Sequence, residues 1–193
     1  MSQFEFVQIT FAIILGLGVT TILNGLGEQL RRRHTHKLMA LQIASSLLLL
    51  LLHLAWLWGF WQTRQTDWNF GLFLAYAAPS IWLALAANVS RIDTFEHSDS
   101  TSVQYFRNAP ILYSLWAAAE AAGIALGFLY ASGLDDYDRT GLLVFSSSRA
   151  LGVLAVLSLG FVKNTTYQWT ILCVLFLQIT AMVFVFVTSL AGT

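Results

Sequence analysis

Six long stretches with almost no charged residues constrain the fold of this chain more than any other feature. Four of them contain no Asp, Glu, Lys or Arg: residues 6–27, 38–63, 68–90 and 164–193. The stretches 108–134 and 140–162 hold one charged residue each, Glu120 and Arg149. Each stretch is longer than the ~20 residues that an α-helix needs to cross a ~30 Å hydrocarbon core.

Helices are predicted because backbone polar groups in lipid must be paired within their own segment. A transmembrane β-barrel would instead show segments of about ten residues with alternating polarity. Only 10% of the 193 residues are charged, against roughly 25% in soluble domains. We therefore predict an all-α integral membrane protein, one domain over residues 1–193 that forms a six-transmembrane-helix bundle. The spans are expected near residues 6–27, 38–61, 68–90, 108–131, 140–162 and 168–190.

The basic residues predict the orientation of the bundle. Seven fall after the first, third and fifth spans: Arg31, Arg32, Arg33, Lys37, Arg91, Arg107 and Lys163. Only two, Arg64 and Arg139, fall in the loops on the other side. Because cytoplasmic loops are enriched in Lys and Arg, we expect an N-out/C-out protein of the plasma (inner) membrane. Tryptophans near the span ends, such as Trp56 and Trp58, are expected to anchor at headgroup depth.

A weak internal similarity suggests two halves, residues 1–90 and 108–193, joined by a cytoplasmic connection over residues 91–107. Residues 45–68 match residues 146–169 without gaps, with six identities in 24 positions. Two three-span halves would have opposite orientations, as in the inverted 3+3 repeats of many transporters. The alternative is chance similarity between two apolar hairpins.

Glu120 and Arg149 are the most informative polar residues, since a charge at mid-bilayer costs on the order of 2.5–3.5 kcal/mol. They lie 15 residues before and 14 residues after Asp135, in the turn of an expected antiparallel hairpin. This spacing places them at nearly equal depth and predicts a salt bridge. Such a pair serves either as a structural clamp that specifies packing or as part of a functional site.

Four further polar residues are candidates for a transport pathway or pore. Asn24 and Glu28 form a polar stripe with Thr21 near the cytoplasmic end of the first span, either at the mouth of a pathway or in an interhelical hydrogen-bond seam. Gln178, near the middle of the last span, is a candidate neighbour of Glu120 and Arg149. His53, the one histidine within a span, is expected to hydrogen-bond inside the bundle, with Tyr76 as a candidate partner.

Several classes of activity are disfavoured, and neither a cofactor nor a metal site is expected. The sequence contains no Walker-type phosphate loop, no HExxH and no G-x-S-x-G. One intramembrane histidine is too few for bis-histidine haem ligation, and one cysteine excludes an internal disulfide. Zero net charge argues against a nucleic-acid partner. We therefore do not expect an enzyme.

Two functional hypotheses remain from the sequence. The first is a small-solute or ion channel or carrier, assembled as a homo-oligomer in the lipid bilayer, with a polar mid-membrane site around Glu120 and Arg149. The alternative is a non-transporting scaffold or sensor subunit that binds a partner protein through its cytoplasmic loops. A membrane enzyme that acts on lipid is a third and weaker interpretation.

Overall fold

The computed structural model describes residues 3–31, 39–61, 69–90, 101–131 and 139–191, and these contain six α-helices and no strand. The helices are α1 (Gln3–Arg31), α2 (Met39–Trp61), α3 (Phe70–Ser90), α4 (Thr101–Ala131), α5 (Arg139–Phe161) and α6 (Thr165–Ala191). The predicted all-α class is confirmed for this part of the chain.

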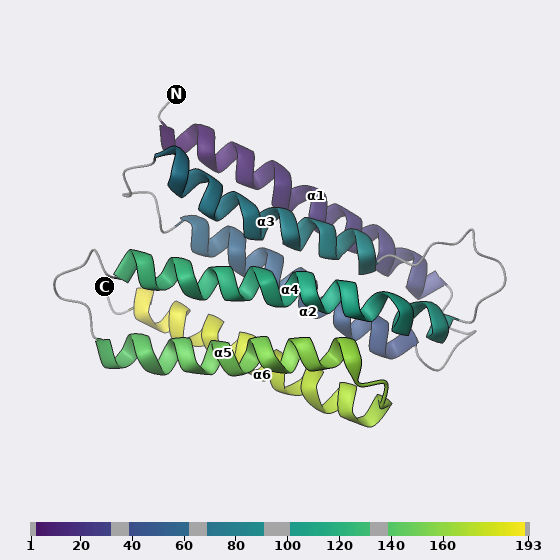
Figure 1. Cartoon of the computed structure of the whole chain (residues 1–193). Helices are drawn as coiled ribbons and strands as arrows, with labels where there is room; N and C mark the ends of the chain where they lie inside the picture. Colours follow the sequence, from purple (N-terminus) through teal and green to yellow (C-terminus); the bar gives the residue numbers. More distant parts are fainter. Residues whose placement is uncertain (1–2, 32–38, 62–68, 91–100, 132–138, 192–193) are drawn as a thin grey trace.

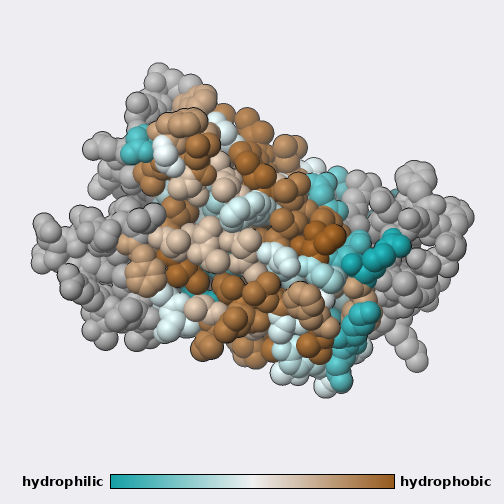
Figure 2. Space-filling model, viewed as in Figure 1, coloured by the Kyte–Doolittle hydropathy of each residue, from teal (hydrophilic) through white to brown (hydrophobic). Residues whose placement is uncertain are grey.

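Within the described part of the chain, four helices are long and apolar enough to cross a membrane, over Phe4–Arg31, Ala40–Phe60, Phe70–Ser90 and Tyr105–Phe128. Large apolar side chains also cover the outside, where Phe70, Leu151 and Leu177 are 74%, 68% and 67% exposed. Figure 2 shows apolar residues across the middle of the molecule and hydrophilic residues gathered toward one end. Because soluble proteins rarely expose apolar surface on this scale, these features are those of a membrane-embedded protein.

The helices lie lengthwise beside one another in two layers (Figure 1). One layer has the order α1, α3, α4, α5, in which each helix packs on the next. The second layer contains α2 and α6, which pack on each other. α2 also contacts α1, α3 and α4, and α6 also contacts α5. The helices α2, α4, α5 and α6 therefore form a closed ring of contacts, and this ring surrounds the site described below.

The two ends of the bundle differ in charge. Both chain termini lie at one end, together with the last turns of α2 and α4 and the first turns of α3 and α5 (Figure 1); we call this the terminal end. Arg31, Arg107 and Lys163 lie at the other, which we call the basic end. The remaining basic residues after the first and third spans lie outside the described residues.

Helix α4 begins earlier than predicted. The sequence placed residues 101–107 in the connection between the halves, but the helix starts at Thr101. The reason is tertiary, because Tyr105 is only 6% exposed and its hydroxyl lies 3.4 Å from Ser45 Oγ of α2. The burial of Tyr105 stabilises the first turns of α4 as a helix, although their polar sequence is typical of a loop. The rest of the predicted connection lies outside the described residues.

Polar side chains cap two of the helices. The Asn69 side chain accepts a hydrogen bond from the Leu72 backbone N–H at 2.8 Å, and Asn164 does the same for Tyr167 at 3.0 Å. Such N-caps satisfy backbone donors that have no partner within the helix. Gln168, fully buried, donates to the Leu159 and Val162 carbonyls and so ties the end of α5 to the start of α6.

The two halves pack differently. α1 packs extensively on α3, and an inverted repeat requires α4 to pack on α6 in the same way. Within the described residues, α6 packs instead on α2 and α5. The helix packing of the described residues therefore does not confirm the predicted repeat.

Candidate functional site

Glu120 of α4 and Arg149 of α5 form the predicted salt bridge. Glu120 Oε2 accepts hydrogen bonds from Arg149 Nη2 at 2.5 Å and from Nε at 3.2 Å. Both side chains are only 14% exposed. The hairpin of α4 and α5 brings them to the same depth, as the spacing around its turn predicted.

The carboxylate of Glu120 is satisfied on one oxygen only. Both hydrogen bonds from Arg149 go to Oε2, whereas Oε1 is buried and has no hydrogen-bond partner within the described residues. A buried acceptor without a partner forfeits the hydrogen bonds that it makes in water. Oε1 is therefore the atom of this pair to which a hydrogen-bond donor would bind most favourably.

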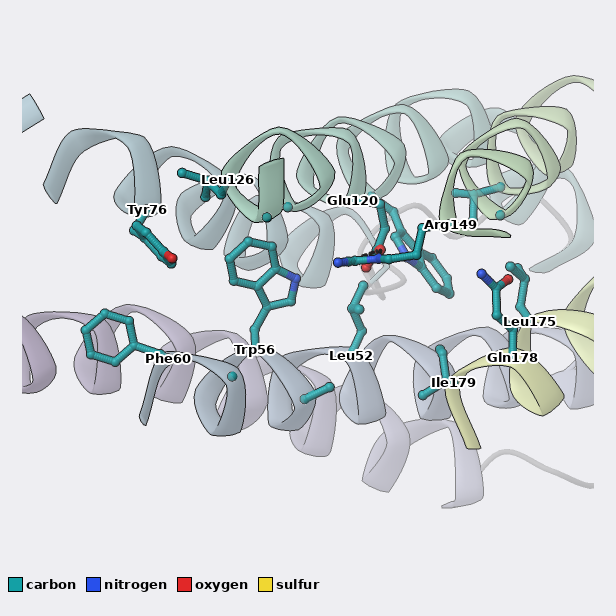
Figure 3. Close-up of a pocket in the computed structure, with 17 residues that line it drawn as sticks. Leu52, Trp56, Phe60, Tyr76, Glu120, Leu126, Arg149, Leu175, Gln178 and Ile179 are labelled. Atoms are coloured by element: carbon teal, nitrogen blue, oxygen red, sulfur yellow. Dashed lines mark hydrogen bonds and ion pairs between the residues drawn. The ribbon is translucent and has the colours of Figure 1, made fainter. Parts of the chain in front are cut away.

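Gly123 allows the surroundings of the salt bridge to pack closely. It follows Glu120 by one helical turn, and a Cβ atom here would lie 3.0 Å from Trp56 Cζ2 and 3.1 Å from Arg149 Nη2. Any larger residue would push against both side chains. Trp56 lies beside the pair on α2 (Figure 3) and lines the same cavity, whereas the sequence favoured an interfacial anchor.

Gly152 likewise allows Gln178 to pack closely against α5. It follows Arg149 by one turn of α5, and a Cβ atom there would lie 2.8 Å from Gln178 Oε1 and 2.9 Å from Nε2. Gln178 Nε2 donates to the Ser148 carbonyl at 3.0 Å. Because a carbonyl only accepts, this bond identifies the amide nitrogen and leaves Oε1 as the acceptor of the side chain.

These residues line one cavity of about 330 Å³ inside the ring of α2, α4, α5 and α6. Figure 3 shows the salt bridge in its middle, Phe60, Tyr76 and Leu126 toward the terminal end, and Gln178 on the opposite side. The wall is mostly apolar, with four glycines. The lining residues are Leu52, Ala55, Trp56, Gly59, Phe60, Tyr76, Trp116, Glu120, Gly123, Leu126, Gly127, Arg149, Gly152, Val156, Leu175, Gln178 and Ile179.

Packed aromatic and hydroxyl side chains lie between the cavity and the basic end. Trp116 lines the cavity and stacks on Tyr113 with ring centroids 6.1 Å apart. The Tyr113 hydroxyl lies 2.8 Å from Ser45 Oγ and 2.7 Å from the Tyr105 hydroxyl. All four side chains are buried. We call Ser45, Tyr105, Tyr113 and Trp116 the inner plug, which joins α2 to α4.

Three of the six candidate residues lie away from the cavity. Asn24 is exposed on α1 and Glu28 is half-buried near its basic end. Thr21, in the same stripe, donates to the Leu17 carbonyl of its own helix. His53 is fully buried, and its Nδ1 lies 2.8 Å from the Leu49 carbonyl, so the hydrogen bond expected inside the bundle is present with Leu49 as the partner. The structure thus brings together Glu120, Arg149 and Gln178 only.

Sequence reasoning missed the glycines and aromatic residues of the site. One signal was present, because Glu120 and Arg149 are each followed by a glycine at the third residue, Gly123 and Gly152. A small residue at this spacing lies on the same helix face and leaves room beside a polar side chain. No such signal in the sequence indicated that Trp56 lines the cavity, because its position depends on how α2 packs against α4.

The described residues contain no group of three or more His, Cys, Asp or Glu side chains that could hold a metal ion. Comparison with protein-family models, with curated proteins and with solved structures finds no match for this chain. The chemistry of the cavity is therefore the basis for a functional assignment.

Proposed function

We propose that this protein is a carrier of a small organic solute, with the cavity around Glu120 and Arg149 as its binding site. The observation that carries the proposal is that Glu120, whose Oε1 has no hydrogen-bond partner within the described residues, lines a cavity of about 330 Å³. Protein interiors are close-packed, and a pair that served only as a clamp would need no space beside it. A buried carboxylate with an unsatisfied oxygen in the lining of a cavity is the arrangement expected of a binding site.

A carrier fits these features better than an ion channel does. Glu120 is neutralised by Arg149 at 2.5 Å, so it does not present the isolated negative charge that attracts cations. The inner plug, whose members are at most 6% exposed, would close the path toward the basic end between α2 and α4. A cavity closed toward one end is one state of an alternating-access cycle.

The membrane arrangement in this proposal is that of the sequence analysis, with six spans in the plasma membrane and both termini outside. Seven of the nine basic loop residues would then be cytoplasmic. The cavity would face the outside and the inner plug the cytoplasm. A homo-oligomer is compatible with this proposal, although one copy of the chain supplies the whole cavity and transport would not require assembly.

Vesicle transport of purified protein tests the proposal. The panel comprises monovalent cations, protons, chloride and small organic solutes of cationic, anionic, zwitterionic and neutral classes. We expect one organic class to enter saturably and faster when the same solute is present inside, because a carrier exchanges its substrate across the membrane.

Two glycine variants connect this flux to the cavity. A Cβ atom at Gly127, in the cavity wall, or at Gly27 in α1 would meet no atom within 4 Å. Gly127→Leu should therefore fill part of the cavity and reduce uptake, whereas Gly27→Leu should not. Ion conductance without saturation would indicate a channel. No flux of any solute would reject autonomous transport and favour the scaffold or sensor subunit.

A further inference from the structure

The charges in the cavity restrict the ligands that it accepts. Glu120 and Arg149 together are neutral, and they present a carboxylate and a guanidinium side by side. Glu120 Oε1 has no hydrogen-bond partner within the described residues, and the Arg149 guanidinium, which only donates, binds Glu120 through Nε and Nη2. A ligand that carries both an ammonium and a carboxylate group complements both members of this pair.

Ligands with other charges fit less well. A lone anion would face Glu120 and a lone cation would face Arg149, and each would bring an uncompensated charge into a largely apolar cavity. An uncharged molecule with an apolar body partitions into the bilayer unaided and needs no carrier. A zwitterion keeps the occupied cavity neutral, and its own charges prevent it from crossing lipid unaided.

The rest of the cavity suits a large apolar group. Phe60, Tyr76 and Leu126 lie toward the terminal end, with Trp56 between them and the salt bridge (Figure 3). At Gly59 and Gly127, also in the wall, a Cβ atom would meet no atom within 4 Å. The 330 Å³ volume is roughly twice the ~150 Å³ of an apolar cavity that accommodates one benzene ring. There is room for a ring and a short charged head.

We infer that the ligand is a zwitterionic α-amino acid with a large apolar side chain. Its ammonium group donates to the Glu120 carboxylate, and its carboxylate accepts from the Arg149 guanidinium. Its side chain lies among Trp56, Phe60 and Leu126. This inference names the substrate class of the proposed carrier and rests on that function.

Binding measurements on the purified full chain in lipid nanodiscs test this inference. Four compounds that share one benzyl side chain are compared by calorimetry at neutral pH: L-phenylalanine, L-phenylalaninamide, N-acetyl-L-phenylalanine and N-acetyl-L-phenylalaninamide. They are respectively zwitterionic, cationic, anionic and uncharged. We expect L-phenylalanine to bind at least about tenfold more tightly than the other three, because each of them lacks one or both charged hydrogen-bond groups. L-alanine should also bind at least about tenfold more weakly, because it buries less apolar surface.

Protein variants test whether the ligand binds in the cavity around Glu120 and Arg149. Gly127→Leu should weaken L-phenylalanine binding about tenfold or more by overpacking the cavity, whereas Gly27→Leu should leave it unchanged. Glu120→Gln removes the partner of the ammonium group and leaves Arg149 without its carboxylate. In that variant the ratio of affinities should move toward N-acetyl-L-phenylalanine. If Glu120→Gln does not fold, the comparison of the two glycine variants still decides whether the cavity is the site.

Equal affinity for the four compounds, tighter binding of the anion to the wild type, or no binding of L-phenylalanine would overturn the inference. Unchanged binding by Gly127→Leu would also overturn it, since the ligand would then lie elsewhere. Failure of the carrier function gives a different pattern, in which L-phenylalanine binds selectively but is not exchanged across vesicles. Exchange of another solute class without amino-acid binding would reject the ligand class alone.

Discussion

Gly18 of α1 lies directly against the imidazole ring of His53 in α2. A Cβ atom at Gly18 would collide with His53 Nε2 and would lie 2.7 Å from Cδ2 and 3.5 Å from the Cα atom of Ala84 in α3. The ring is also held by its Nδ1, which lies 2.8 Å from the Leu49 carbonyl. The absence of a side chain at Gly18 therefore allows α1, α2 and α3 to meet around a buried histidine.

Gly18→Ala should destabilise the protein, because the held ring cannot move away from an added methyl group. We expect a loss of about 1–3 kcal/mol in the free energy of unfolding, the usual cost of overpacking. Gly16→Ala is the matched control, since a Cβ atom there meets no atom within 4 Å, and it should be neutral or stabilising by up to about 1 kcal/mol. Equal effects of the two changes in detergent unfolding would contradict the close packing of Gly18.

The Glu120–Arg149 pair should show energetic coupling. Glu120→Ala and Arg149→Ala should each lower the free energy of unfolding by up to about 3–5 kcal/mol, because each leaves a buried charged partner uncompensated. The double variant should cost less than the sum of the singles by about 0.5–3 kcal/mol. A double-mutant cycle in detergent measures this difference, and strict additivity would mean that the two side chains do not interact.

The inner plug should depend more on Tyr113 than on Tyr105. The Tyr113 hydroxyl makes two short contacts, of 2.8 Å to Ser45 and 2.7 Å to Tyr105, whereas the second contact of Tyr105, to Ser45, is 3.4 Å. Tyr113→Phe should therefore reduce the free energy of unfolding by about 1–3 kcal/mol, and Tyr105→Phe by less. The reverse order in unfolding experiments would show that the cluster is held chiefly through Tyr105.

Gly152→Ala should affect ligand binding more than stability. The new methyl group would displace the end of the Gln178 side chain, which is flexible, and break its hydrogen bond to the Ser148 carbonyl. We expect a stability change within about 1.5 kcal/mol, the net value of one hydrogen bond, together with weaker solute binding. Gly27→Ala, at an open position of α1 that does not line the cavity, should leave binding unchanged and be neutral or stabilising by up to about 1 kcal/mol. A loss of stability well above that of Gly27→Ala, with binding unchanged, would exclude Gln178 from the site.

The proposed orientation is tested by accessibility. Single cysteines at Ser2 and Gly192, in a Cys173→Ala background, should react from outside the cell with a membrane-impermeant thiol reagent. A cysteine at Thr35, within the basic loop, should react only after the membrane is permeabilised. The expectation follows from the distribution of Lys and Arg between the loops. Labelling of Thr35 in intact cells, or protection of both termini, would reverse the orientation.

The helices and the Glu120–Arg149 pair were predictable because both depend on relations close along the chain. Helical hydrogen bonds are made within a few residues, so a long apolar stretch specifies its own secondary structure. The pair is joined by one hairpin, and its register follows from counting residues on either side of the turn. The same reasoning misjudged residues 101–107, where burial of Tyr105 outweighs a polar composition.

Only the tertiary structure decided which helices surround the site. The packing of α6 on α2, and of α1 on α3, brings together segments that are not adjacent in the sequence. That packing places Gln178 and Trp56 beside the salt bridge and keeps Asn24, Glu28 and His53 away from the cavity. All of these residues lie in similarly apolar helices. The volume left between their side chains depends on how the helices pack against one another. The pattern of residues along a single helix does not predict that packing.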